Sequence, residues 1–417
     1  MKILLIDDSK DFRALVGLHL FRHFKEAQLA DYEIENLGKP GPDFDWSKYD
    51  VLLLDYNLGG GEDGFTWLKE FSSMPGFPPT IILTAEGDEY IAVKAIKLGA
   101  ADYLNKLDLT PQRLVKAIIE ATEYTPEKKA EQEKDKIQAE HLVQELHDKN
   151  QKSSRKPVIG SAYKFVRVIG QGAMSKVYLA ERQSDQLSLV LKILEIDNLT
   201  DDVAVVRFMQ EAELVSKLSS PFVVKIYDYG LANNYCFIAM EFFSRGDLKQ
   251  RMELRLPSDL AVNYMTHIVY GLDAIHKIGV VHRDLKPANI MFRGDDNLAL
   301  ADFGISKKLD SQSELTTLGQ ILGTPHYMSP EQGEGKMIDE RSDIYSAGIL
   351  FYELLTRNKP YIATTPAALI YQHVYAPVPE LPPDLAKYQE IINKTLAKHP
   401  DERYPSAVDL IQALESL

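Results

Sequence analysis

Cysteine is nearly absent from this chain of 417 residues, since Cys236 is the only one. A single thiol forms neither an intramolecular disulfide nor a cysteine-based metal site, so both are excluded. Cys236 itself lies in the apolar run YCFIAM. That pattern predicts a buried strand residue there instead of a reactive thiol.

Long hydrophobic runs are also missing. A membrane-spanning helix needs about 20 consecutive apolar residues, and no run in the sequence approaches that length. The opening MKILLIDD reaches acidic residues after only four apolar positions, which is too short for a signal peptide. The sequence therefore predicts a soluble cytoplasmic protein without a membrane partner.

An excess of positive charge is the third absence. The chain has 47 Lys and Arg against 61 Asp and Glu, a net charge of -14. Surfaces that bind nucleic acid or anionic membranes are basic because they neutralise phosphates, so nucleic acid is not an expected partner. The length of the chain suits two or three domains.

Up to about residue 124, short apolar runs alternate with amphipathic stretches. Each run is four to six residues long and is bounded by Gly, Asp or Pro, as strands commonly are. Five strands alternating with helices predict a doubly wound α/β fold with a five-stranded parallel sheet. The predicted strands are KILLID (2–7), YEIENL (32–37), VLLLDY (51–56), TIILTA (80–85) and ADYLNK (101–106).

Two of the amphipathic stretches predict helices that pack one apolar face on this sheet. The first face consists of Phe12, Leu15, Val16, Leu20 and Phe24. The second consists of Ile91, Val93, Ala95, Ile96 and Leu98.

A segment rich in Glu, Lys and Gln follows at residues 125–157. Thr125 followed by Pro126 is typical of a helix start, and the stretch from Ser153 to Pro157 ends the helix. A sparse apolar seam leaves two interpretations open, a solvated spacer helix or a short dimerising coiled coil. The seam consists of Ile137, Leu142, Val143 and Leu146.

Acidic and polar residues stand where the predicted strands end. Asp7 and Asp8 end the first strand, Asp55 the third, Thr84 the fourth and Lys106 the fifth. The carboxyl ends of parallel strands meet at one edge of a sheet, so these groups should lie close together. Two like charges about 4 Å apart repel by about 4 kcal/mol at an effective dielectric of about 20. Three clustered carboxylates therefore favour a bound Mg²⁺.

This constellation resembles the receiver domain of bacterial response regulators, over residues 1–124. The resemblance implies that Asp55 accepts a phosphoryl group from a cognate histidine kinase or phosphotransfer protein. It also implies two sets of site residues. The metal ligands would be Asp7, Asp8, Asp55 and Asn57, and the switch residues Thr84, Tyr103 and Lys106. Leu107 and the loop GGGED at 59–63 depart from the usual receiver pattern, but neither removes a chemical group.

The segment HRDLKPAN (282–289) followed by DFG (302–304) combines groups that phosphoryl transfer requires. An alcohol that attacks a nucleotide γ-phosphate needs a proton acceptor, a cation on the phosphoryl oxygens, and oxygen ligands for Mg²⁺. Asp284, Lys286, Asn289 and Asp302 supply these groups in that order.

From about Tyr163 onward the chain resembles a protein Ser/Thr kinase of the bacterial eukaryotic-like type. The resemblance implies an α+β bilobal fold over residues 158–417, with an N-lobe at 158–243 and a C-lobe at 244–417. The expected cofactors are ATP and Mg²⁺, and the expected substrate is a protein with Ser or Thr.

Motifs before the catalytic segment extend this resemblance. The run VRVIGQGAMSKVYLA predicts a strand, a glycine turn and a strand, with Ser175 in the position of the third glycine. Lys192 would hold the α- and β-phosphates while Glu211 holds the lysine by an ion pair. The resemblance assigns ATP binding to Gly170, Gly172, Val177, Lys192, Met240, Glu241, Phe243, Asn289 and Asp302, and metal binding to the last two.

Regulatory features lie on both sides of the DFG segment. Arg283 beside Asp284 marks the class of kinases whose basic pocket is neutralised by a phosphorylated activation loop. Thr316 and Thr317 are the best-placed autophosphorylation candidates in that loop. Glu331 of the SPE motif is expected to pair with Arg403.

Together these patterns predict a Ser/Thr kinase whose activity is set by phosphorylation of Asp55, acting as a homodimer. Two alternatives stay open: a receiver-controlled pseudokinase scaffold, and an active kinase whose receiver is only a dimerisation platform.

Overall fold

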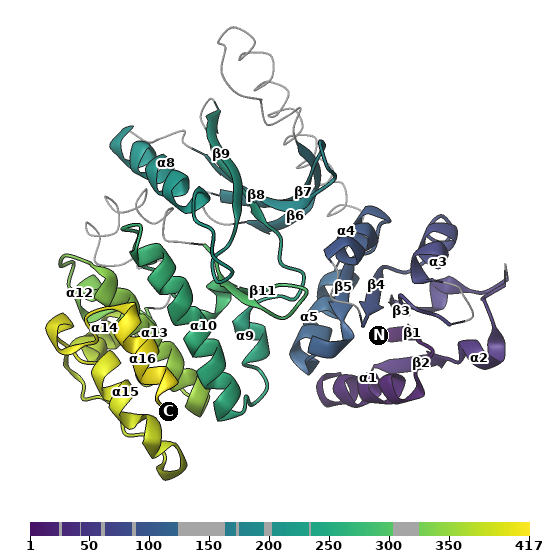
Figure 1. Ribbon diagram of the computed structural model, residues 1–417. Helices are drawn as coiled ribbons and strands as arrows, with labels where there is room; N and C mark the ends of the chain where they lie inside the picture. Colours follow the sequence, from purple (N-terminus) through teal and green to yellow (C-terminus); the bar gives the residue numbers. More distant parts are fainter. Residues whose placement is uncertain are drawn as a thin grey trace, which may run out of the picture. The chain divides into compact units, whose positions relative to one another are not determined.

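The computed structural model of the chain is drawn in Figure 1. It describes residues 1–24, 27–41, 43–59, 63–85, 89–123, 163–171, 175–195, 202–232, 235–302 and 325–417. The predictions for segment 125–157, Gly172, Thr316 and Thr317 lie outside the described residues.

The N-terminal part contains a five-stranded sheet in the order β2-β1-β3-β4-β5. Every pair of neighbouring strands is parallel. The strands are β1 (Lys2–Ile6), β2 (Gln28–Tyr32), β3 (Val51–Asp55), β4 (Thr80–Thr84) and β5 (Asp102–Asn105). The helices are α1 (Lys10–His23), α2 (Ile34–Leu37), α3 (Gly64–Phe71), α4 (Glu89–Lys97) and α5 (Pro111–Thr122), with short 3-10 turns η1 (Trp46–Lys48) and η2 (Lys106–Asp108).

Helices cover both faces of this sheet, because successive residues of its buried strands point to opposite sides. Leu5 and Leu53 belong to a cluster that contains residues of α1 and α5. Leu4 and Leu54 belong to a second cluster with residues of α3 and α4. The predicted doubly wound architecture is confirmed.

One strand prediction was wrong in position. YEIENL (32–37) is not a strand, because β2 covers Gln28–Tyr32 and the short helix α2 follows at Ile34–Leu37. Strand β2 is at the sheet edge and pairs only with β1, so its residues stay exposed or half-buried and give no apolar run. The apolar pair at Ile34 and Leu37 has helical spacing instead.

Leu15 was also placed on the wrong face of its helix. Residues Phe12, Val16, Leu20 and Phe24 recur every fourth position and contact the cluster under α1. Leu15 lies beside that stripe and is 40 % exposed. The predicted second face is better matched, since Ile91, Val93 and Ala95 are buried.

The C-terminal part begins with a second five-stranded sheet, in the order β6-β7-β8-β10-β9. Neighbours β6 and β7 are antiparallel, as are β10 and β9. The predicted strands and the helix carrying Glu211 are confirmed. These elements are β6 (Tyr163–Gln171), β7 (Ser175–Arg182), β8 (Ser188–Glu195), α8 (Asp202–Ser216), β9 (Ile226–Ala232) and β10 (Tyr235–Glu241). Cys236 is fully buried in β10, and burial raises the pKa of its thiol to about 11.

Helices dominate the described residues that follow β10. They are α9 (Leu248–Arg251), α10 (Ser258–His276), α12 (Pro330–Gly333), α13 (Glu340–Thr356), α14 (Pro366–Tyr375), α15 (Gln389–Thr395) and α16 (Ala407–Glu415). Two short strands, β11 (Ile290–Phe292) and β12 (Leu298–Leu300), form an antiparallel hairpin, and 3-10 turns occur at η3 (Pro287–Asn289), η4 (Pro383–Tyr388) and η5 (Pro400–Glu402).

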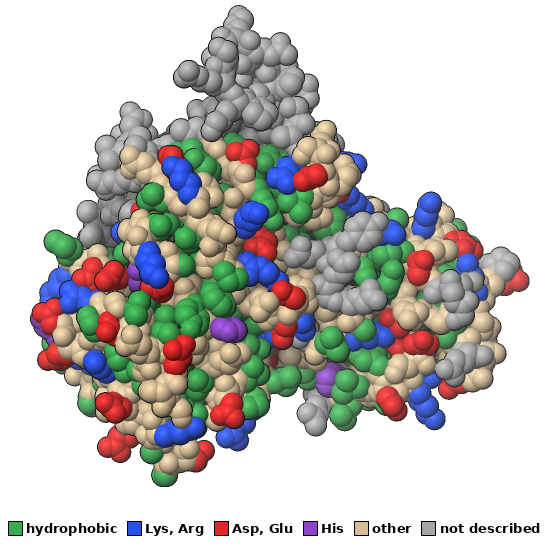
Figure 2. Space-filling view, in the orientation of Figure 1, with side chains coloured by type: hydrophobic (Ala, Val, Ile, Leu, Met, Phe, Trp, Pro, Cys, Tyr) green, Lys and Arg blue, Asp and Glu red, His purple; other side chains and the backbone are tan. Residues whose placement is uncertain are grey.

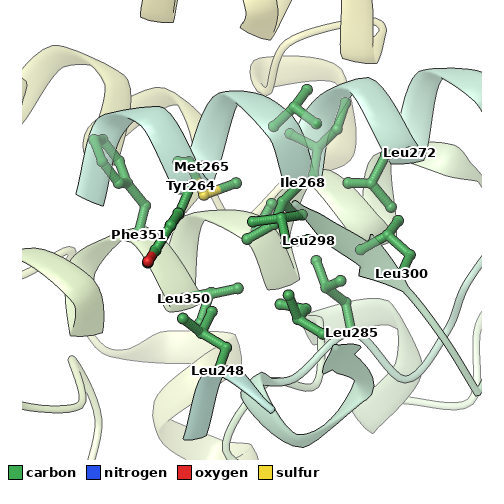
Figure 3. Close-up of a cluster of buried hydrophobic side chains, with 14 of the residues drawn as sticks. Leu248, Tyr264, Met265, Ile268, Leu272, Leu285, Leu298, Leu300, Leu350 and Phe351 are labelled. Atoms are coloured by element: carbon green, nitrogen blue, oxygen red, sulfur yellow. The ribbon is translucent and has the colours of Figure 1, made fainter. Parts of the chain in front are cut away.

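The core of this helical region surrounds α10. Ile268 and Leu272 of α10 pack against Leu298 and Leu300 of the hairpin, and Leu285 lies beneath them (Figure 3). Leu285 is in the segment between Asp284 and Lys286, so the core directly supports the residues with predicted catalytic roles.

Surface charge is mixed on the face seen in Figure 2, where acidic and basic side chains are interspersed over the described residues. Within the described part of the chain, no helix is both long enough and apolar enough to cross a membrane.

Candidate functional site

The predicted acidic cluster forms at the carboxyl edge of the N-terminal sheet. Asp55 is the last residue of β3, and Asp7 directly follows β1. Carboxylate oxygens of Asp7, Asp8 and Asp55 all lie within 4.8 Å of one another. The Nζ of Lys106 lies 2.7 Å from Oδ2 of Asp7 and 2.7 Å from Oδ2 of Asp55. The sheet therefore brings together the groups that the sequence placed at its strand ends.

Burial governs the electrostatics of this cluster. Asp7 is fully buried and Asp55 is 2 % exposed. Burial raises the pKa of the Asp55 carboxyl to about 6 despite the hydrogen bond from Lys106, and the charge of Asp7 adds to the rise. Burial likewise raises the pKa of Asp7. One ammonium group therefore compensates the carboxylates only in part.

This donor set fits a divalent cation. Oδ2 of Asp7 is fully buried, and the Lys106 ammonium 2.7 Å from it is shared with Oδ2 of Asp55. Carboxylate oxygens are the ligands that Mg²⁺ prefers, and a second positive centre would offset the repulsion among Asp7, Asp8 and Asp55.

Of the remaining predicted receiver residues, Thr84 and Tyr103 lie on neighbouring strands and Asn57 lies just beyond β3. Thr84 is 2 % exposed and directly follows Leu83, the β4 residue that pairs with Asp55. Thr84 itself pairs with Asn105 of β5, the residue before Lys106. Tyr103 on β5 is half-buried. Asn57 is exposed beyond β3, and its side chain accepts a hydrogen bond from the Gly59 backbone.

The start of α3 approaches the cluster closely. A Cβ atom on Gly64 would lie 2.2 Å from the carbonyl oxygen of Asp55. Only glycine therefore fits this position, and the tight contact fixes the backbone of Asp55 against the helix.

The catalytic segment forms a compact polar group in the C-terminal part. The Nζ of Lys286 donates to Oδ2 of Asp284 at 2.7 Å. The Nδ2 of Asn289 donates to the carbonyl oxygen of Asp284 at 2.8 Å and to its Oδ2 at 3.1 Å. The predicted proton acceptor, cation and metal-ligand amide thus converge on one carboxylate.

Backbone strain marks this segment. Arg283 has φ 64° and Asp302 has φ 52°, in the left-handed region that non-glycine residues rarely adopt. Asp343 of α13 holds the first of these, because its Oδ2 accepts from the His282 backbone at 2.7 Å and its Oδ1 accepts from the Arg283 backbone at 2.9 Å. Such strain persists where surrounding contacts over-determine the conformation, and it concentrates at functional sites.

Lys192 of β8 contacts the carboxylate of Asp302. Glu211 of α8 has its Oε1 4.0 Å from Nη1 of Arg283. These contacts bring Lys192 and Glu211 to the catalytic segment from two different elements. The ion pair between Lys192 and Glu211 themselves stays a prediction.

Three residues to which the resemblance assigns ATP binding, Met240, Glu241 and Phe243, lie at the end of β10 or just beyond it. The carboxylate of Glu241 accepts hydrogen bonds from Arg293, at 2.6 Å from Nε and 2.9 Å from Nη2, and Phe243 is buried. Met240 is half-buried. The Glu241 side chain is therefore held by the protein's own Arg293. Among the described turn residues, Gly170 pairs with Val177 across β6 and β7.

The pair expected between Glu331 and Arg403 is confirmed. Nη1 of Arg403 lies 2.7 Å from Oε1 of Glu331, and Nη2 lies 2.8 Å from Oε2. Burial would raise the pKa of Glu331, but hydrogen bonds from Arg403 and Ser342 outweigh it and hold the pKa at about 2.

Replacing Arg403 by methionine should lower the free energy of unfolding of the C-terminal part by about 3–5 kcal/mol at pH 7, because the Glu331 carboxylate stays buried without its cation. The folded pKa of Glu331 is about 2 against an ordinary 4.5. The contribution of the Glu331–Arg403 pair to the free energy of unfolding is thus complete above about pH 4.5 and is lost as the pH falls toward 2. Urea unfolding across that window measures it.

A matched control uses the exposed pair of Lys336 and Glu334, whose atoms Nζ and Oε2 are 2.8 Å apart. Lys336→Met should leave the unfolding transition unchanged, because exposed ion pairs contribute little. Equal urea midpoints for Arg403→Met and wild type would contradict the stabilising role of the buried pair.

Two supporting residues were missed by the sequence reasoning. Arg293 was missed because its partner Glu241 is far away in the sequence. Asp343 could have been predicted from the sequence, because an acidic residue within the apolar run SDIYSAGIL requires buried hydrogen-bond partners.

Comparison with known proteins identifies similar families. Residues 163–414 match the family model described as protein kinase domain, and residues 3–119 match that of the response regulator receiver domain. Among curated relatives, serine/threonine-protein kinase PknA of Corynebacterium glutamicum is 34% identical over 269 residues, covering 62% of this chain and 57% of the relative.

A second relative is serine/threonine-protein kinase PrkC of Bacillus subtilis, 36% identical over 258 residues, covering 60% of this chain and 40% of the relative. The chain thus spans about half the length of the curated relatives it matches. The solved kinase domain of Mycobacterium tuberculosis PknI is 26% identical, with a TM-score of 0.48, covering 61% of this chain and 95% of that one.

Proposed function

Because the chain belongs to the protein kinase family, we propose that it transfers the γ-phosphate of ATP to Ser or Thr hydroxyls of a protein substrate. The convergence of Lys286 and Asn289 on the Asp284 carboxylate carries this proposal. A pseudokinase scaffold is disfavoured, since Lys192, Glu211, Asp284, Asn289 and Asp302 are all present.

Each residue of this set has a defined role in the proposed reaction. Asp284 accepts the proton of the substrate hydroxyl, and Lys286 neutralises the γ-phosphoryl group. Lys192, paired with Glu211, binds the α- and β-phosphates. Asn289 and Asp302 would hold Mg²⁺, which would neutralise charge on the phosphate oxygens.

Incubation with labelled ATP and a generic basic protein substrate tests the proposal, with Asp302→Asn as the comparison. The amide of asparagine is a poorer Mg²⁺ ligand than a carboxylate, so label in the substrate should fall to near background. Equal labelling by the two proteins would refute the kinase assignment.

We further propose that the receiver domain at residues 3–119 regulates this activity through phosphorylation of Asp55. The clustering of Asp7, Asp8 and Asp55 around Lys106 supports this proposal. Asn57 would complete the Mg²⁺ site, and Thr84, Tyr103 and Lys106 would respond to the phosphoryl group. The phosphoryl donor would be a histidine kinase or a phosphotransfer protein.

The proposed domain boundaries follow from this assignment. The receiver would occupy residues 1–124, a helical linker 125–157 and the kinase 158–417. A homodimer formed through the receiver and linker would bring two kinase domains together. Coupling of about 1–3 kcal/mol through such an arrangement changes activity roughly 5- to 150-fold.

A further inference from the structure

A buried arginine lies beneath the acidic cluster and has no assigned role. Arg13, in the first turn of α1, is only 6 % exposed. Its Nη1 donates to the carbonyl oxygen of Asp7 at 2.6 Å. Its Nε lies 2.7 Å from Oδ1 of Asp31 on β2, whose side chain is 47 % exposed. Arg13 therefore links β2 to the loop that carries Asp7 and Asp8.

The loop from Asp7 to Ser9 is held by several contacts besides this one. The Ser9 backbone donates to Oδ1 of Asp7 at 2.8 Å, and the Arg13 backbone donates to the Ser9 carbonyl at 3.0 Å. Lys106 binds the other oxygen of Asp7. These contacts orient the carboxylate, whereas the Arg13 side chain fixes the main chain from which the carboxylate extends.

The charge of Arg13 also bears on cation binding. A buried guanidinium near a metal site would repel the cation if its charge were uncompensated. Here Asp31 pairs with Nε, and the Asp7 carbonyl accepts from Nη1, so the repulsion is offset and the geometric effect dominates. The rigid planar guanidinium of Arg13 contacts the Asp7 carbonyl and the Asp31 carboxylate at the same time, and the flexible ammonium of a lysine does not reproduce that geometry.

We propose that Arg13, anchored by Asp31, is a positioning residue for the divalent-cation site of Asp7, Asp8 and Asp55. The inference rests on the proposed receiver function. Contacts that orient metal ligands without touching the metal commonly change metal affinity by about 10- to 100-fold when removed.

Calorimetric titration of the full chain with Mg²⁺ tests this inference, with the Asp55→Asn protein as the baseline for binding elsewhere. Arg13→Met should weaken binding by about 10-fold or more. Arg13→Lys, which keeps the charge but loses the two-acceptor geometry, should give an intermediate affinity. Asp31→Asn should give a smaller loss, because it only loosens the anchor.

Measuring the stability of the N-terminal part distinguishes a positioning role of Arg13 from a purely structural one. Both tryptophans of the chain, Trp46 and Trp67, are buried in the N-terminal part, so tryptophan fluorescence reports its unfolding. Leu114→Ala removes a fully buried side chain on α5. It should lower the unfolding temperature while leaving Mg²⁺ affinity unchanged.

Each outcome is decisive. Wild-type affinity in Arg13→Lys and Asp31→Asn overturns the inference, even if Arg13→Met does not fold. Tighter Mg²⁺ binding in the Arg13 variants also overturns it, because charge repulsion would then dominate. If wild type binds no more Mg²⁺ than Asp55→Asn does, the proposed receiver function fails as well.

Discussion

Replacing Asp284 by asparagine is expected to lower the rate of phosphoryl transfer to a protein substrate by about 10²- to 10⁴-fold. An asparagine amide does not accept the proton of the attacking hydroxyl. It also removes the negative charge that holds Lys286, whose Nζ lies 2.7 Å from Oδ2 of Asp284. Initial rates at saturating ATP, with the intact fold checked by circular dichroism, measure the effect.

The same chemical change at an exposed position is the matched control. Asp384 in η4 is exposed, so Asp384→Asn should phosphorylate substrate at the wild-type rate. Measuring ATP affinity distinguishes a loss of the chemical step in Asp284→Asn from a loss of nucleotide binding. Asp284→Asn should bind ATP as wild type does, because Asp284 acts on the hydroxyl. A wild-type rate for Asp284→Asn would exclude Asp284 as the proton acceptor.

Asp55→Asn is expected to abolish incorporation of phosphate into the receiver from a small donor such as acetyl phosphate. The amide is not a nucleophile toward phosphorus, whereas the Asp55 carboxylate is buried beside Lys106 and two further carboxylates. The bond formed in wild type is an acyl phosphate, so its label should be lost on treatment with base or hydroxylamine. Quantification of labelled protein before and after that treatment measures it.

Asp11→Asn provides the control, because Asp11 is an exposed carboxylate in the same part of the chain. It should be labelled to the wild-type level. Labelling must also be measured in the Asp284→Asn background, which removes autophosphorylation on hydroxyls. If base-labile label persisted in Asp55→Asn, a residue other than Asp55 would be the phosphoryl acceptor.

Strand ends were the most predictable part of the candidate sites. Asp7 and Asp55 stand at the ends of apolar runs, and a parallel sheet sends such ends to one edge whatever the loops do. The catalytic segment was predictable for a different reason, since Asp284, Lys286 and Asn289 are so close in sequence that one local loop conformation brings them together. Site residues that are close in sequence, or that the sheet topology brings to one edge, could therefore be predicted from the sequence.

Contacts between distant segments were not recoverable. Arg13 pairs with Asp31 and Arg293 with Glu241, and nothing in either local sequence specifies the partner. The position of β2 was not predictable for another physical reason. An edge strand buries too few side chains to need the apolar run of a central strand.

The central claim is that phosphorylation of the receiver changes the rate of the kinase. The most direct test compares substrate phosphorylation by the full chain with and without beryllofluoride, a mimic of the phosphoryl group, in wild type and Asp55→Asn. The account predicts a change of roughly 5- to 150-fold, in either direction, for wild type and none for the variant. Identical rates in wild type, at beryllofluoride concentrations that saturate the receiver, would contradict it.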